Sequence, residues 1–251
     1  MGDMEHIYGP VPSRRLGFSL GVDLVPHKIC SFDCVYCQLG KTTEKTIVRR
    51  EYVPAGDVVA DVKEFLERGK RCDYITLSGS GEPTLNSKTG EIIEAVKSLT
   101  GIPVAVLTNG STMTDSDVRR ELSLADVVIP SLDAAVQSLF EKVNRPCRGM
   151  RVEDIIAGIS EFKKSFSGKV WLEVMLVDGV NDSEEAFREL SRAIGKIKPD
   201  KVHLNTVVRP PCERWAKPLS TERLEEIANS LNAEAVSYTH LRAHETVLDL
   251  V

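Results

Sequence analysis

Stretches with the alternation of a β-strand and stretches with the periodicity of an α-helix take turns along this chain from Phe18 onward. Parallel strands need a crossover connection, usually a helix, so this repeated order predicts a parallel α/β sheet with right-handed crossovers. We expect strands at residues 18–25, 74–78, 104–108, 127–133, 170–177 and 201–208, and helices near residues 55–68, 90–99, 115–124, 152–166, 183–197 and 221–231.

Polar side chains recur on one alternate face of all six expected strands, mostly near the carboxyl ends. A parallel strand covered by helices on both faces reads instead as a nearly unbroken apolar run. The pattern therefore indicates a lumen that holds something wet or charged, as in β/α barrels, where reacting groups sit at that end. A flat, doubly wound sheet of the flavodoxin or Rossmann type stays open as an alternative. The polar positions are Asp23, Thr76, Ser78, Thr108, Ser131, Asp133, Glu173, His203 and Asn205.

Three cysteines, Cys30, Cys34 and Cys37, stand within eight residues. Thiolates are the usual protein ligands of iron–sulfur clusters, and a four-iron cluster normally takes four of them. Three thiolates would hold three irons and leave the fourth open to a substrate. A structural zinc site completed by His27 or a distant cysteine is the alternative. Cys72, Cys147 and Cys212 are scattered, and burial as small apolar side chains accounts for them.

Length and composition limit the other possibilities. The 251 residues suit one large α/β domain, and a formal charge of −5 argues against indiscriminate binding to nucleic acid or membrane. The first residues lack a secretory signal pattern, and no stretch approaches the roughly 20 apolar residues of a membrane span. We therefore expect a cytoplasmic, reducing setting and no membrane partner.

A second motif supports the cluster interpretation. The run Leu77–Pro83 follows the second expected strand and, by itself, is an ordinary glycine-rich turn. Together with the cysteine spacing and Tyr36 just before the last cysteine, its Gly-Glu-Pro run resembles the radical S-adenosylmethionine (radical SAM) superfamily. The resemblance covers about residues 9–233. It implies a six-stranded parallel partial (β/α)6 barrel with a core domain at residues 1–235, and it implies a 4Fe–4S cluster and S-adenosyl-L-methionine (SAM) as cofactors.

The resemblance also implies which residues hold these cofactors. The three clustered cysteines would be the metal ligands, and the Gly-Glu-Pro run would bind the amino group of SAM. Asp133 would accept a ribose hydroxyl, although capping of the following helix is an equally simple role. Tyr36 would flank the adenine, and the backbone at Leu176 would form its binding edge. The expected SAM contacts are Tyr36, Gly81, Glu82, Pro83, Asn109, Ser131, Asp133 and Leu176.

The implied chemistry is reductive cleavage of SAM to a 5′-deoxyadenosyl radical, with an electron from a flavodoxin or ferredoxin, and hydrogen abstraction from the substrate. No catalytic acid–base residue is assigned: Glu173 and His203 are interpreted as lumen residues that hydrogen-bond. The flanks Gly9–Gly17 and Val207–Pro211 resemble a branch of short proteins distantly related to wyosine-type tRNA base synthases. The substrate is therefore a small molecule or RNA.

One departure argues against a tRNA base as substrate: the wyosine enzymes carry a second cysteine-bound cluster, and no second compact triad is present here. Two alternatives therefore stay open, a glycyl-radical-type activating enzyme with a protein partner and a non-enzymatic zinc- or cluster-stabilised binding module. Basic residues offer phosphate contacts at Arg14, Arg15, Lys41, Lys45, Arg49, Arg50, Arg145, Arg148 and Arg151.

The last residues differ in character from the rest. From about Ser237 the sequence resembles translated sequencing-adapter DNA, so we expect residues 236–251 to be a non-native tail and the natural carboxyl terminus to be missing. His240 and His244 are accordingly not interpreted as metal ligands. An amphipathic helix is the alternative.

Overall fold

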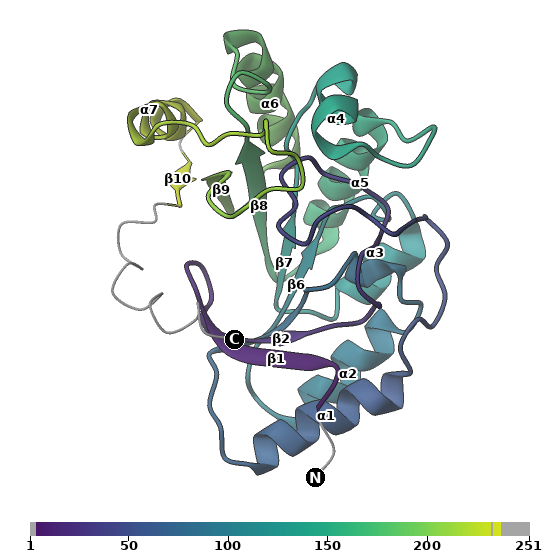
Figure 1. Cartoon of the computed structure of the whole chain (residues 1–251). Helices are drawn as coiled ribbons and strands as arrows, with labels where there is room; N and C mark the ends of the chain where they lie inside the picture. The colour runs from purple at the N-terminus through teal and green to yellow at the C-terminus, as the bar shows by residue number, and fades with distance from the viewer. Residues whose placement is uncertain (1–3, 232, 237–251) are drawn as a thin grey trace.

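The structure of this protein is a computed structural model that describes residues 4–231 and 233–236. Within those residues the main sheet has eight strands in the order β1-β2-β5-β6-β7-β8-β9-β10, antiparallel between β1 and β2 and parallel elsewhere (Figure 1). The six expected strands all form and follow one another in sequence order. Their bounds, with those of the two outer strands, are β1 (Ile7–Ser13), β2 (Gly17–Val22), β5 (Tyr74–Leu77), β6 (Val104–Thr108), β7 (Val127–Pro130), β8 (Lys169–Leu176), β9 (Lys201–Thr206) and β10 (Glu234–Ala235).

Helices cover one face of this sheet, and the expected helices are all present. Figure 1 shows them on the outside of the curved sheet. The described helices are α1 (Ala55–Glu67), α2 (Thr89–Leu99), α3 (Ser116–Leu122), α4 (Gln137–Asn144), α5 (Val152–Ser165), α6 (Glu184–Ile197) and α7 (Thr221–Leu231), with a 3-10 turn η1 (Pro83–Leu85). A small second sheet pairs β3 (Ile29–Cys30) with β4 (Glu44–Lys45).

The two faces of each strand have different environments. On β8 the side chains of Val170, Leu172 and Val174 are fully buried against the helices, whereas Glu173, on the alternate face, is partly exposed. Burial of apolar side chains on one face is the main force that fixes this curvature and register. The opposite face is the lumen that the polar pattern predicted, so the sheet is a partial barrel and not a flat sheet covered on both sides.

Apolar side chains close the lumen at the amino-terminal ends of the strands. Leu16, in the turn between β1 and β2, is buried with Ala105, Val127 and Ile129, and Trp171 packs against them. This layer is a floor, so the space that remains for a ligand lies toward the carboxyl ends of the strands.

Besides the short elements β3, β4, η1 and β10, the sequence analysis missed β1 and α4. β1 contains Gly9, Pro10 and Pro12, which obscure a strand pattern, but an edge strand with an irregular register tolerates proline. The eight-residue helix α4 begins after Val136 without a side-chain cap, so it has no start signal. The fourth expected strand is also shorter than residues 127–133: the regular strand ends at Pro130, and Ser131 adds an isolated bridge to Glu173.

The end of the described chain bears on the expected tail. Val236 is buried, and its N–H donates to the carbonyl of Leu204. Residues 237–251, which include His240 and His244, lie outside the described residues, so the boundary stays a prediction. No helix within the described part of the chain is both long and apolar enough to cross a bilayer.

Candidate cofactor site

The three clustered cysteines lie on a loop that begins with β3 and is stabilised by hydrogen bonds within the loop. The N–H of Cys37 donates to the carbonyl of Cys34 (3.1 Å), and Gly40 repeats this bond to Cys37 (3.2 Å). Asp33 accepts the N–H of Thr42 at 2.7 Å, which closes the base of the loop. We call residues 30–37 the cysteine loop.

Each of the three sulfurs receives an N–H donor. Lys28 Nζ lies 3.1 Å from the Cys37 sulfur, and Asn144 Nδ2 lies 3.4 Å from that of Cys34. Asn109 Nδ2 lies 3.5 Å from the Cys30 sulfur, which also faces the N–H of Phe32 at 3.4 Å. Donors of this kind stabilise a thiolate, the form in which cysteine binds metal.

The thiols also act on one another. Burial raises the pKa of Cys30 to about 12, and the Glu82 carboxylate adds to this shift. Burial likewise raises the pKa of Cys34, with contributions from Asp133 and from the other two thiols. Such sulfurs ionise when a cation compensates their charge, because metal binding deprotonates a coordinating thiol. This donor set fits an iron–sulfur cluster.

Glu82 joins the Gly-Glu-Pro turn to the end of β6. Its side chain is 2% exposed, and within the described residues it accepts four hydrogen bonds: from Thr84 N (3.1 Å), Thr84 Oγ1 (2.6 Å), Thr108 Oγ1 (2.7 Å) and Asn109 N (2.7 Å). Burial raises the pKa of Glu82, and these donors lower it in part. With its carboxylate so occupied, a ligand at this turn meets main-chain atoms of the turn.

Gly81 is required by a close approach of two chain segments. A Cβ atom at this position would lie 2.0 Å from the carbonyl oxygen of Ile29 and 2.8 Å from Val25 Cγ2. The N–H of Glu82 donates to that same carbonyl at 3.0 Å. The absence of a side chain at Gly81 therefore lets the turn dock on β3, directly before Cys30.

Asp133 links the cysteine loop to β8 and α4. Its Oδ2 accepts the Tyr36 hydroxyl (2.5 Å) and Asn144 Nδ2 (2.6 Å), and its Oδ1 accepts the N–H of Met175 (2.8 Å). Burial raises the pKa of Asp133 to about 6, and these hydrogen bonds oppose the shift. We call Glu82 and Asp133 the rim carboxylates.

The remaining predicted residues lie around this rim. Pro83 opens η1, and Ser131 leaves β7 with its N–H bonded to the carbonyl of Thr108 at 2.9 Å. The carbonyl of Leu176 accepts the Thr206 hydroxyl at 3.0 Å. Asn109, besides facing Cys30, donates to Ser31 Oγ at 2.9 Å. The structure thus brings the predicted residues together, while their contacts with SAM stay a prediction.

Sequence reasoning missed three parts of this site. Lys28 and Asn144 have no local signal, because an isolated basic or amide residue resembles any surface residue. The segment after β9 is the third: Glu213 N donates to the carbonyl of Val35 at 2.9 Å, and Arg209 NH1 donates to Gln38 Oε1 at 2.8 Å. It brings Cys212 close enough for the charges of Cys37 and Lys28 to act on the pKa of its thiol, which burial raises.

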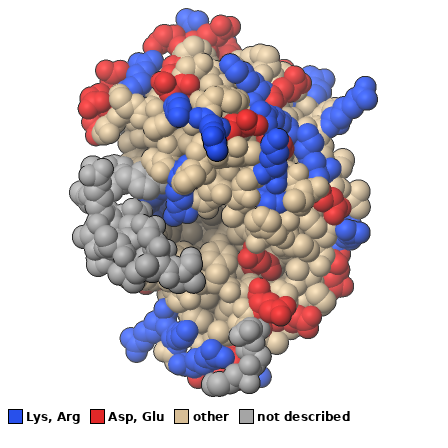
Figure 2. Space-filling model, in the orientation of Figure 1, with Lys and Arg blue, Asp and Glu red and all other residues tan. Residues whose placement is uncertain are grey.

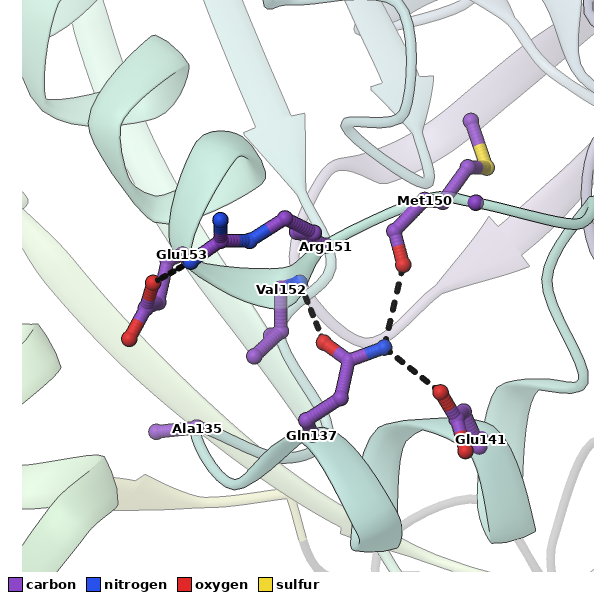
Figure 3. Close-up of a pocket in the computed structure, with 8 residues that line it drawn as sticks. Ala135, Gln137, Glu141, Met150, Arg151, Val152 and Glu153 are labelled. Carbon is purple, nitrogen blue, oxygen red and sulfur yellow. Dashed lines mark hydrogen bonds and ion pairs between the residues drawn. The ribbon is translucent and has the colours of Figure 1, made fainter.

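Two shallow depressions lie outside the rim, beside the segment that follows α4. The first, about 350 Å³, is held by Gln137, which donates to Met150 O (3.0 Å) and Glu141 Oε1 (2.8 Å) and accepts the N–H of Val152 (2.9 Å) (Figure 3). The second, about 280 Å³, lies between Lys45 and Arg148. The hydrogen bonds of Gln137 in the first depression all go to other residues of its lining, so this side chain links α4 to the start of α5.

Among the described residues, no three His, Cys, Asp or Glu side chains are grouped so that they could hold a metal ion. That result concerns a site for a single ion. In a four-iron cluster each thiolate binds a separate iron, so the three sulfurs do not have to meet at one point.

Comparison with known proteins gives the family. Residues 24–190 match the Radical SAM superfamily. A UPF0026 protein of Methanocaldococcus jannaschii is 35% identical over 231 residues, which are 91% of this chain and 72% of that protein. A ribosomal RNA large subunit methyltransferase N of Nitrosopumilus maritimus is 28% identical, over 78% of this chain and 56% of the relative.

Another relative is about three times as long as the segment that matches this chain. A protein of Brachyspira hyodysenteriae named GTPase Obg is 40% identical over 222 residues, but this chain spans only 33% of its length. The chain contains no Gly-x-x-x-x-Gly-Lys-Ser/Thr loop, so the match carries no GTPase chemistry to it.

Solved structures agree on the fold. TYW1 with a lysine-pyruvate adduct bound has a TM-score of 0.65 at 16% identity, over 85% of this chain and 72% of that one. A radical SAM methyltransferase from Sphaerobacter thermophilus has a TM-score of 0.66 at 21% identity, over 86% and 64%. The chain therefore belongs to the radical SAM superfamily of iron–sulfur enzymes and, within it, to the UPF0026 family.

Proposed function

We propose that Cys30, Cys34 and Cys37 hold a 4Fe–4S cluster with one open iron, at which SAM binds and accepts an electron from a flavodoxin or ferredoxin. When bound, these cofactors supply a 5′-deoxyadenosyl radical that takes a hydrogen atom from the substrate. The observation that supports the proposal most directly is the N–H donor found at each of the three clustered sulfurs.

The chain's own residues would hold and shield this centre. The Lys28 ammonium, buried beside Cys37, offsets the negative charge of the ligands. Asn109 and Asn144 connect the cysteine loop to the rim carboxylates, which fixes the orientation of the sulfurs. The main chain of the Gly-Glu-Pro turn, Asn109, Ser131, Asp133 and the backbone at Leu176 would surround SAM, with Tyr36 beside its adenine.

The proposal is tested by anaerobic loading with iron and sulfide. We expect wild-type protein to bind about four irons and four sulfides, to show an EPR signal after reduction, and to form 5′-deoxyadenosine from SAM and dithionite. Cys34→Ala removes all three properties, whereas the matched variant Cys72→Ala, remote from the loop in sequence, keeps them. A colourless protein, or one that holds a single zinc, contradicts the proposal.

An RNA substrate is a second candidate. It is supported by the name of the ribosomal RNA methyltransferase relative and by the Lys and Arg side chains that gather around α4 and the segment after it (Figure 2). Some of these cations are already paired, as in Arg145–Glu213 at 2.6 Å and Arg151–Glu153. We expect a tRNA mobility shift that weakens steeply with salt if RNA is the substrate. Binding that does not depend on salt contradicts this candidate.

A further inference from the structure

Three buried polar atoms on the lumen side of the sheet have no partner. Within the described residues, four buried side-chain nitrogen or oxygen atoms lack a hydrogen bond: one, Asn144 Oδ1, lies at the rim, and the other three are Arg15 Nε, His203 Nδ1 and Asn205 Oδ1. The residues His203 and Asn205 are 3% and 2% exposed. Because buried polar groups are nearly always paired, such a concentration of unpaired atoms calls for a missing partner.

These atoms belong to side chains that meet around one carboxylate. Glu173 Oε1 accepts Arg15 NH1 and Asn205 Nδ2, each at 2.5 Å, while Oε2 has no hydrogen-bond donor among the described residues. Glu173 on β8 is the register partner of His203 on β9, whose ring packs edge-on against Trp171. Arg15 reaches them from the turn between β1 and β2. We call Arg15, Glu173, His203 and Asn205 the lumen cluster.

The lumen cluster lies next to the proposed SAM site but deeper along the strands. The carbonyl of Glu173 accepts the N–H of Leu132, and Met175, two residues further along β8, donates to Asp133. Two residues of a strand span about 7 Å, so the cluster lies one small group below the rim. Figure 2 shows this face of the molecule hollowed near its middle.

The free atoms define what a partner must offer. Arg15 Nε is only a donor, and Asn205 Oδ1 and Glu173 Oε2 are only acceptors. Nε2 of His203 lies 3.4 Å from Glu234 Oε2, so a neutral imidazole with its proton on Nε2 presents Nδ1 as an acceptor. We infer that the lumen cluster binds an uncharged amide-type group of the substrate, a lactam or carboxamide, whose N–H and carbonyl lie side by side. The N–H meets Asn205 or Glu173, and the carbonyl oxygen meets Arg15 Nε.

Charge favours this class over an anion. Arg15 and Glu173 neutralise each other, so a carboxylate or phosphate would have to compete with Glu173 for Arg15. Burial lowers the pKa of His203, with the Arg15 charge acting in the same direction, so the imidazole is neutral near pH 7. A neutral group with both a donor and an acceptor fits without leaving a buried charge unpaired.

The test uses 2-pyridone, the simplest lactam of this shape, and its matched analogue 2-methoxypyridine, which lacks the N–H. Ligand-observed NMR at millimolar concentration should detect 2-pyridone on the wild-type protein, and 2-methoxypyridine and acetate should bind at least about tenfold more weakly. Asn205→Leu should lower the affinity for 2-pyridone by about tenfold. Glu173→Gln, which leaves the Arg15 charge uncompensated, should raise the affinity for acetate by about tenfold.

A control variant and four contrary outcomes complete the test. Glu189→Gln, at an exposed ion pair on α6, should change neither affinity. Equal binding to all variants, no detectable 2-pyridone, or displacement of 2-pyridone by SAM overturns the inference. So does a high-resolution crystal structure in which soaked 2-pyridone is absent and water alone pairs the three atoms.

The inference names the substrate class of the proposed reaction and rests on that function for its meaning. Its failure is nevertheless distinguishable, because the binding test is run on the protein both before and after cluster loading. Protein that binds 2-pyridone without cleaving SAM retains the subsite and contradicts the radical chemistry. Protein that cleaves SAM without binding 2-pyridone retains the radical chemistry and contradicts the amide subsite.

Discussion

The rim carboxylates and the lumen cluster are both buried polar groups, and they differ in how completely the protein itself satisfies them. Within the described residues, Glu82 accepts four hydrogen bonds and Asp133 three from side-chain and main-chain donors. The lumen cluster leaves three buried atoms unpaired. Fully satisfied networks give rigidity, whereas unsatisfied ones cost stability until a partner arrives. The rim carboxylates are therefore a frame that is paired before any ligand binds, although Oδ1 of the neighbouring Asn144 has no partner among the described residues, and the lumen cluster presents three unpaired atoms to a ligand.

The largest effect is expected from breaking the frame at Glu82. Replacement Glu82→Leu leaves the donors of Thr84, Thr108 and Asn109 buried without an acceptor, which should cost about 3 kcal/mol or more of the free energy of unfolding. Urea unfolding of the protein before cluster loading measures this. Glu82→Gln keeps one acceptor oxygen and should lose about half as much. A loss below about 1 kcal/mol for the leucine variant would show that the rim is not a frame.

A second prediction concerns the close approach at Gly81. The Cβ of Gly81→Ala would push against the carbonyl of Ile29, so the Gly-Glu-Pro turn and β3 must separate, at a cost of about 2 kcal/mol. Gly56, in α1, has open space around the corresponding position, and Gly56→Ala should stabilise the protein by about 0.5–1 kcal/mol. Thermal unfolding of both variants checks the pair, and equal effects would contradict the steric argument.

The third prediction is a pH dependence that originates at Asp133. Its pKa in the folded protein, about 6, lies above its ordinary value of 3.8. Folding therefore favours the protonated carboxyl, and the resulting stability is fully present below pH 3.8 and is lost as the pH rises through about 6. Relative to Asp133→Asn, the wild-type protein should lose on the order of 2 kcal/mol between these values. Parallel unfolding curves at all pH values would refute this.

The smallest effect on stability is expected in the lumen. Asn205→Leu removes an unpaired oxygen and leaves Glu173 paired with Arg15, so the free energy of unfolding should change by less than about 1 kcal/mol in either direction. Chemical denaturation alongside Glu82→Leu gives the comparison directly. A loss as large as that of Glu82→Leu would mean that the lumen cluster belongs to the frame.

The sequence allowed the repeated part of the fold to be predicted and the cysteine loop to be located, because both have local signals. Hydrophobic periodicity located the six parallel strands and their helices, and the spacing of three cysteines located the loop. The missing parts depend on contacts between distant residues. Asn144 touches Cys34 across 110 positions, and Arg15 touches Glu173 across 158. The polar alternation did place Glu173, His203 and Asn205 in the lumen, although not the unpaired state of the histidine and asparagine.

The turn between β1 and β2 lies apart from the cysteine loop, so substrate recognition and cofactor binding depend on different segments of the chain. Arg15 is contributed by a short hairpin tip outside the strand–helix repeat, whereas the cysteine loop is held by β3, α4 and the segment after β9. On the proposed assignment, varying Arg15 alone would change molecular recognition while the redox machinery and the buried Leu16 beside it stayed constant. The tip of this hairpin is accordingly the place at which a substitution would change the preferred substrate group without changing the rest of the fold.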